Sequence, residues 1–290
     1  MGLYDFTVYS VIERNGVIHR DRTALIYGDE RITYKQLLDR VDRLSYGLSR
    51  IGVAHGDRIA VMAQNCPEFV YLYGACAKLG SVMLPINWRL KPEEVAFVIS
   101  DGAPKVIFVS SDLHAMASPL LSQLDLVGKS YSTDQAQGEF KAFAELTDSD
   151  GDGPVSDVQS KDAYVIIHTA AVGGRPRGAP LSQEGLLLAG LQMLASWGLT
   201  PDACNLGMLP FFHVAGLGFW LLAMQAGGTS VILPKFDADL ALQHIERDRV
   251  TMFAGFPPML STLLDRNEEL KCDLSSLKQV GGLETPETVT

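Results

Sequence analysis

Apolar segments of strand length and helix length alternate through most of this 290-residue chain, and this alternation limits its fold strongly. Segments 57–64, 81–87 and 105–111 have the short apolar pattern of buried strands, and 67–80 and 91–102 between them have the length of helices. This order predicts parallel sheets with crossover helices. Because 47% of the residues are hydrophobic, a sizeable core is available, and the length favours two lobes.

The same order of elements recurs in the second half of the chain. GSVMLP at 80–85 and TSVILP at 229–234 each follow an apolar helix that ends in glycine, and each precedes an acidic, polar helix. A weak internal duplication of this kind predicts an α/β fold with two similar lobes. We expect the first lobe at about 56–200, and a second lobe that combines about 1–55 with 201–290.

Residues 130–161 form the expected linker, because they are polar, acidic and marked by glycine and proline. Within them, Asp148–Gly153 begins like a calcium loop, but Gln159 stands where such a loop has its closing glutamate. The four cysteines have neither CxxC spacing nor a histidine cluster beside them. These patterns predict a solvated loop, free thiols and no metal site.

The charge balance narrows the classes of partner. Lys plus Arg is 24 and Asp plus Glu is 34, which gives a net charge of −10 and argues against nucleic-acid binding. Residues 203–234 lack charged side chains and are long enough to span a bilayer, but Pro210, His213 and the pair Gly227-Gly228 interrupt them. We expect no transmembrane span and, because no basic signal opens the chain, a cytoplasmic protein. The sequence is also compatible with a homo-oligomer.

A glycine-rich, cationic stretch, HTAAVGGRPRGA at 168–179, follows the apolar run AYVII. Backbone N–H groups of such a turn can converge on an anion, and a guanidinium adds a forked donor suited to phosphate. A P-loop is not supported, since Ala179 and Pro180 occupy its Lys and Ser/Thr positions, and no GxGxxG occurs here. A turn without a ligand is the alternative.

The stretch resembles the phosphate loop of the adenylate-forming enzymes, a family of acyl-CoA synthetases, luciferases and peptide-synthetase adenylation domains. Their loop reads T-S-G-[ST]-T-G-x-P-K-G. The matching residues are Thr169, Gly174, Pro176, Arg177 in the lysine position, and Gly178. Ala170, Val172 and Gly173 replace three residues that carry hydroxyl groups, so backbone amides and Arg177 would have to hold the phosphates.

Other segments extend the resemblance over essentially the whole chain. The turn Pro210–Gly216 is similar to the family's motif at the carboxylate pocket, where the resemblance makes His213 a positioning group and not a base. The implied acyl pocket comprises Phe212, His213, Val214, Gly216 and Phe256. The implied nucleotide-binding residues are Thr169, Val172, Gly173, Gly174, Arg177 and Gly178 in the loop, and Gly281, Gly282, Leu283 and Glu284 in a later turn.

The resemblance implies that ATP, with Mg²⁺, activates a carboxylic acid to an acyl-adenylate, and that coenzyme A then takes the acyl group. His213 and Arg177 are the residues implied in catalysis, and a fatty or aromatic acid is favoured by the apolar turn. The chain is expected to be part of the N-terminal domain, without the C-terminal domain and inactive by itself. The alternative is a non-catalytic relative that binds an acyl group or nucleotide through a degenerate loop.

Overall fold

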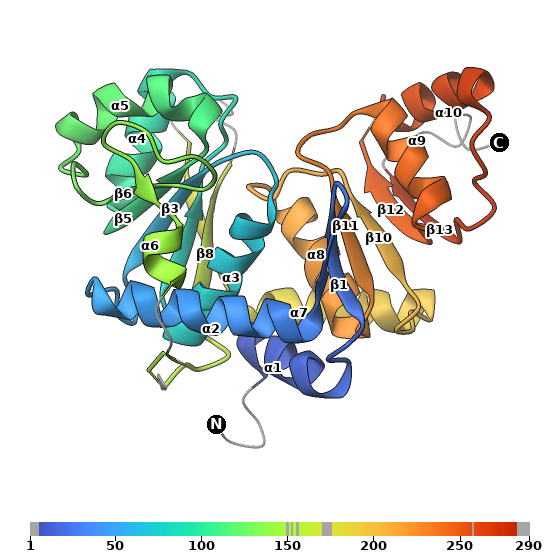
Figure 1. Cartoon of the computed structure of the whole chain (residues 1–290), viewed down its shortest axis with the longest axis horizontal. Helices are drawn as coiled ribbons and strands as arrows, with labels where there is room; N and C mark the ends of the chain where they lie inside the picture. The colour runs from blue at the N-terminus through green and yellow to red at the C-terminus, as the bar shows by residue number, and fades with distance from the viewer. Residues whose placement is uncertain are drawn as a thin grey trace.

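The computed structural model describes residues 6–148, 151, 153–154, 157–169, 176–256 and 258–282. Two twisted sheets stand side by side with helices between them and on their outer faces (Figure 1). Both sheets are mainly parallel, as the alternating pattern predicts. The α/β fold class with two similar lobes is therefore confirmed.

The first sheet contains seven strands in the order β7-β6-β5-β3-β4-β8-β9. Its strands are β3 (Arg58–Met62), β4 (Val82–Pro85), β5 (Val106–Val109), β6 (Ser130–Ser132), β7 (Lys141–Ala142), β8 (Ala163–His168) and β9 (Gly178–Ser182). Neighbouring strands are parallel except for β9, which runs antiparallel to β8 at the edge.

The second sheet contains six strands in the order β13-β12-β10-β11-β1-β2. Its strands are β1 (Thr23–Tyr27), β2 (Glu30–Thr33), β10 (Cys204–Gly207), β11 (Thr229–Ile232), β12 (Met252–Gly255) and β13 (Gln279–Gly282). Here β2 is the antiparallel edge strand, paired with β1.

Helices cover both faces of both sheets. They are α1 (Val8–Ile18), α2 (Tyr34–Arg50), α3 (Pro67–Leu79), α4 (Pro92–Gly102), α5 (His114–Gln123), α6 (Ala144–Thr147), α7 (Gln183–Trp197), α8 (Val214–Ala226), α9 (Ala238–Arg247) and α10 (Met259–Leu270). Alternate residues of β3 enter different cores: Ile59 and Val61 pack with α2 and α3, while Ala60 and Met62 pack with α4 and α5. The first of these cores continues into α8, so it joins the two sheets.

The duplication extends well beyond the two similar strands β4 and β11. One order of elements occurs twice, first from β1 to β6 and again from β8 to β13. In each copy, a β-hairpin is followed by a helix and then by four strands that are separated by three helices. The hairpins are exchanged: β1 pairs with β11 of the second copy, and β8 pairs with β4 of the first. The proposed lobe limits, 56–200 against 1–55 plus 201–290, stay a prediction.

Two expectations about local structure are wrong. Residues 130–147 are not a linker, since they supply β6, β7 and α6, and Phe108 of β5 pairs with Tyr131 in a regular register. The α8 helix also begins at Val214, within the expected turn Pro210–Gly216, because the side chain of His213 caps its first turn. Val214 and Gly216 therefore belong to a helix and not to the preceding turn.

The charge-free segment 203–234 is divided among β10, α8 and β11. In the part of the chain that the structure describes, no helix combines the length and hydropathy that a membrane crossing requires. All four cysteines are free, in agreement with their spacing.

Candidate active site

The glycine-rich stretch connects the two strands of the β8–β9 hairpin, and the sequence analysis did not anticipate β9. Its root is closed by the backbone N–H of Thr169, which donates to the carbonyl oxygen of Arg177 at 3.1 Å. Pro176 is buried beside this contact, whereas Arg177 is exposed. Val172, Gly173 and Gly174 lie outside the described residues.

The guanidinium of Arg177 is available for a ligand. No ion pair or side-chain hydrogen bond connects it with another residue that the structure describes. Gly178 lies opposite His168 in the hairpin, where a Cβ would come within 2.8 Å of the Ile166 side chain. Gly178 therefore permits close packing of the two strands at the root of the loop.

His213 lies at the N-terminus of α8, on the other side of the site. Its Nδ1 accepts a hydrogen bond from the backbone N–H of Ala215 at 3.2 Å, which makes His213 the cap of the helix. In the neutral ring the proton then resides on Nε2, so the ring can donate from this atom. The ring is exposed and meets Phe256 edge-on, with centroids 5.9 Å apart.

The turn before His213 is fixed by side chains of the first lobe. The buried amide of Asn65 accepts from the N–H of Phe211 at 2.8 Å and donates to the carbonyl oxygens of Leu209 and Leu233. The hydroxyl of Tyr73 donates to the carbonyl oxygen of Phe211 at 2.8 Å. Because these groups are buried, each bond restrains the turn that carries His213.

A cavity of about 430 Å³ lies between the hairpin root, α4 and the N-terminus of α8. It brings together five residues that the sequence singled out: Thr169, Pro176, Phe212, His213 and Val214. The N-terminus of a helix favours a negative charge, because its free N–H groups and the helix dipole both point toward the ligand. The cavity thus combines apolar walls with hydrogen-bond donors.

The other described candidates, Arg177 and Gly178 included, do not line this cavity. Phe256 touches the site through the ring of His213. Gly216 is buried in the first turn of α8, where a Cβ would collide with the carbonyl oxygen of Pro210. Gly281 and Gly282 lie at the end of β13, paired with Ala254 and Gly255 of β12. Leu283 and Glu284 are outside the described residues.

Several residues that line the cavity were missed by the sequence analysis. Asn87 and Leu90 follow β4, and Glu94 comes from the first turn of α4. His168 ends β8 with a side chain that is only 5% exposed, and its Nε2 lies 3.0 Å from a carboxylate oxygen of Asp101. The position of Asn87 and His168 at the carboxyl ends of buried parallel strands could have indicated them.

Within the described residues, no group of three or more His, Cys, Asp or Glu side chains is arranged to hold a metal ion.

Comparison with known proteins assigns the family. Residues 12–290 match the model of the AMP-binding enzyme family. The chain belongs to this family. The match covers both sheets and the cavity between the hairpin and α8. It includes the glycine-rich stretch on which the resemblance to adenylate-forming enzymes was based.

Curated proteins that resemble the chain include CoA ligases. Indoleacetate–CoA ligase of Aromatoleum aromaticum is 32% identical over 272 residues, which are 93% of this chain and 53% of that protein. Long-chain-fatty-acid–CoA ligase FadD13 of Mycobacterium tuberculosis is 30% identical and covers 90% and 52% respectively. The chain spans about half the length of these relatives.

Solved structures agree with the family assignment. A candidate long-chain-fatty-acid CoA ligase from Rhodopseudomonas palustris superposes with a TM-score of 0.94 at 44% identity, over 99% of this chain and 72% of that one. The anthranilate CoA ligase AuaEII, solved with anthranoyl-AMP, has a TM-score of 0.89 at 20% identity over 97% of this chain and 55% of that one, a similarity that concerns the fold.

Proposed function

We propose that a protein carrying this chain, together with the further length that its relatives have, is an AMP-forming acid–CoA ligase. A carboxylate oxygen attacks the α-phosphorus of ATP, and pyrophosphate leaves. The sulfur of coenzyme A then attacks the acyl carbon, AMP leaves, and the thiol proton passes to solvent. The observation that carries this proposal is the cavity in which the hairpin root and the His213 cap face each other in a chain of this family.

The phosphates of ATP, with Mg²⁺ bound to them, are proposed to lie at the hairpin loop. Here the exposed side chain of Arg177 and the hydroxyl of Thr169, which lines the cavity, would join the backbone amides of the loop as donors to the phosphates. Fixed donors of this kind lower a barrier at which negative charge develops. The nucleotide-binding set is Thr169, Val172, Gly173, Gly174, Arg177, Gly178, Gly281, Gly282, Leu283 and Glu284.

His213 is proposed to hold the substrate carboxylate. Its Nδ1 is engaged with Ala215, so the neutral ring offers Nε2–H as a donor and has no free basic nitrogen. The beginning of α8 adds a favourable field for the carboxylate. His213 therefore orients the attacking oxygen, while Phe212, Val214, Gly216 and Phe256 shape the apolar pocket of a fatty or aromatic acid.

The complete protein is proposed to be cytoplasmic, with the 290 residues alone unable to form a thioester. A non-catalytic relative is the rival, motivated by the lost hydroxyl groups at Ala170, Val172 and Gly173.

The decisive experiment is acid-dependent exchange of labelled pyrophosphate into ATP by the complete protein. It is measured with one aromatic acid, such as indoleacetate, and one long-chain fatty acid, and His213→Ala serves as the matched variant. We expect exchange with at least one of these acids and a higher KM for that acid in the variant. If neither acid supports exchange although both bind, the non-catalytic rival is correct.

A further inference from the structure

A second cavity lies in the first lobe, at the point where the order of the strands reverses. β3 has β4 on one side and β5 on the other, and the helices that follow β3 and β5 cover opposite faces of the sheet. The segments that follow β3 and β5 therefore turn to opposite faces of the sheet and leave a crevice at the carboxyl ends of these two strands. In open α/β sheets, ligands bind in crevices of this kind.

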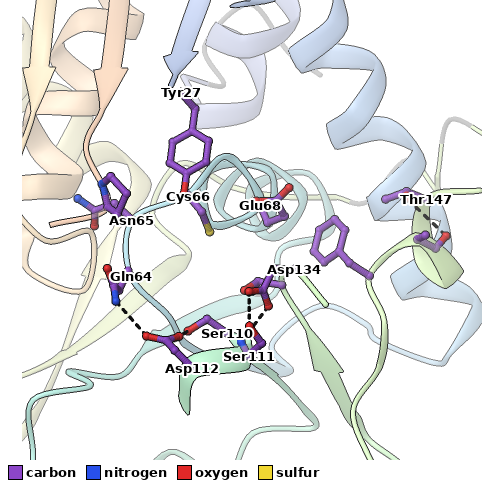
Figure 2. Close-up of a pocket in the computed structure, with 14 residues that line it drawn as sticks. Tyr27, Gln64, Asn65, Cys66, Glu68, Ser110, Ser111, Asp112, Asp134 and Thr147 are labelled. Carbon is purple, nitrogen blue, oxygen red and sulfur yellow. Dashed lines mark hydrogen bonds between the residues drawn. The ribbon is translucent and has the colours of Figure 1, made fainter. Parts of the chain in front are cut away.

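The crevice encloses about 660 Å³, a volume within the ordinary range for small-molecule sites. Its walls come from the segments after β3, β5 and β6, and from α6. In Figure 2, Tyr27 reaches from the end of β1 toward Cys66, while Asp112 and Asp134 lie on the opposite side. Because Tyr27 belongs to the exchanged hairpin, the second lobe closes a cavity of the first. This cavity shares no lining residue with the candidate active site.

The lining carries negative charge without cations. Glu68, Asp112 and Asp134 face the cavity, and no Lys, Arg or His is among the described residues that line it. Across the described chain, none of these three carboxylates forms an ion pair. Three carboxylates without an ion pair make this cavity unfavourable for a phosphate or carboxylate ligand, and therefore for ATP and the acid substrate.

The carboxylates on the floor of the cavity are held in place by neutral donors. Asp112 accepts from Nε2 of Gln64 at 2.9 Å and from the Ser110 hydroxyl at 2.5 Å, and Asp134 accepts from the N–H and hydroxyl of Ser111 at 2.8 and 2.6 Å. These donors fix each group without neutralising it, so spare lone pairs remain for a ligand.

The pKa values of two of the acidic groups are shifted in opposite directions. Burial raises the pKa of Glu68, and the hydrogen bonds from its own backbone N–H and from the Cys66 side chain lower it by less. Burial acts on Asp134 as well, but the hydrogen bonds from Ser111 outweigh it and lower the pKa of this carboxyl. Asp134 is thus a firm anion at neutral pH, while Glu68 gains most from a positively charged neighbour.

We propose that this cavity is a binding site for a small aliphatic diamine or polyamine. Ammonium groups can donate to the fixed carboxylates, and the rings of Tyr27 and Phe143 offer surfaces for methylene groups and for cation–π contact. A bare metal ion fits less well, because the described side chains form no group of three metal ligands here.

The test is titration calorimetry of the complete protein with spermidine, and with putrescine as the shorter probe. We expect saturable binding of one spermidine per chain and weaker binding of putrescine. Asp112→Asn and, separately, Glu68→Gln should each lower the association constant at least about tenfold, as the loss of a charge-assisted contact predicts. The Glu68 variant keeps the test valid if replacement of Asp112 disturbs folding, because Glu68 does not take part in the hydrogen bonds of Asp112 with Gln64 and Ser110.

The matched control is Asp21→Asn, which changes the net charge equally at a side chain that is 91% exposed and outside the cavity. Spermidine affinity should stay within about twofold in this variant, because an exposed carboxylate contributes little. The proposal is overturned if the unaltered chain shows no saturable spermidine binding. It is equally overturned if Asp21→Asn weakens binding as much as the two cavity variants do.

Discussion

The two exchanged hairpins have the same place in the two copies of the fold and carry different turns. The hairpin β1–β2 turns through Gly28 and Asp29 alone, whereas β8–β9 turns through residues 169–177. Each hairpin leads into a helix with a hydroxyl cap, Thr33 for α2 and Ser182 for α7. The comparison shows that a scaffold can keep its strands and caps while one turn is extended into a candidate phosphate loop.

The hairpins are also anchored at corresponding places, with unequal strength. Arg31 of the first hairpin binds Asp248 at the end of α9, and His168 of the second binds Asp101 at the end of α4. The Asp248 side chain is fully shielded and also contacts His244 and Arg247, but that of Asp101 is 48% exposed. The hairpin with the short turn is therefore held more firmly than the one at the candidate active site.

The largest effect is expected when the second hairpin receives the short turn of the first. Replacement of residues 169–177 by Gly-Asp in the complete protein should reduce ATP–pyrophosphate exchange by at least about 10³-fold, because several phosphate donors are lost together. Thermal unfolding should remain cooperative, since the strands keep their register. Exchange that survives this replacement would show that the loop does not bind the phosphates.

Removal of the firmer anchor should give the next largest effect. Asp248→Asn is expected to lower the free energy of unfolding by about 3 kcal/mol, because the buried His244 and two half-exposed arginines lose the charge of a fully shielded partner. Asp101→Asn, at a half-exposed pair, should cost less than about 1 kcal/mol. Urea unfolding measures both values, and equal losses would contradict the proposed difference between the anchors.

The same carboxyl gives a pH dependence of known sign. Burial tends to raise the pKa of Asp248, but hydrogen bonds from His244, Arg31 and Arg247 outweigh it and hold the pKa below the usual 3.8. The stabilisation is therefore complete above that value and is lost as the pH falls through the lower folded pKa. Urea titrations at neutral pH and near pH 3 should show that Asp248→Asn and the unaltered protein become more alike in acid.

A smaller loss is expected when only the charge of the long loop is removed. Arg177→Ala should slow pyrophosphate exchange roughly 10- to 150-fold, the equivalent of one charge-assisted contact of about 1.5–3 kcal/mol. Arg177→Lys should recover part of the rate, since it restores the charge without the fork. Arg20→Ala, at an exposed pair with Asp21, is the control and should leave exchange unchanged.

The smallest effect is expected at the turn of the first hairpin. Gly28 has a φ of 59° and open space around its Cα, so Gly28→Ala meets no clash and costs only the strain of a left-handed backbone. The expected loss of stability is about 1 kcal/mol by urea unfolding, with exchange activity unaltered. An effect on exchange would contradict a purely structural role for this turn.

Much of the fold could be predicted from sequence because its elements have strong periodicity. The buried strands β3, β4 and β5 and the helices between them appear within a few residues of their expected limits. By contrast, β6 reads SYS and β7 has only two residues, so neither has enough apolar pattern to be distinguished from a loop. The pairing of β1 with β11 could not be predicted from the sequence, because it depends on contacts between distant parts of the chain.

The candidate site was predictable where a motif lies in one segment and was missed where the wall is assembled from several. His213, Phe212 and Thr169 came from recognisable stretches and do share a cavity. Asn87 and Glu94 reach that cavity from β4 and α4 without any local signature. The acidic cavity at the ends of β3 and β5 was missed for the same reason, because its polar residues look like ordinary loop residues until the strand order is known.

The exchange of hairpins has a consequence for biosynthesis. Leu25 leaves the ribosome long before Ser230, its partner in the neighbouring strand, so the first hairpin must wait with an unpaired edge while most of the chain is made. Such late, long-range closure slows folding and exposes a strand that can pair with another molecule. We therefore expect nascent chains of this protein to depend on chaperones until β11 has been synthesised.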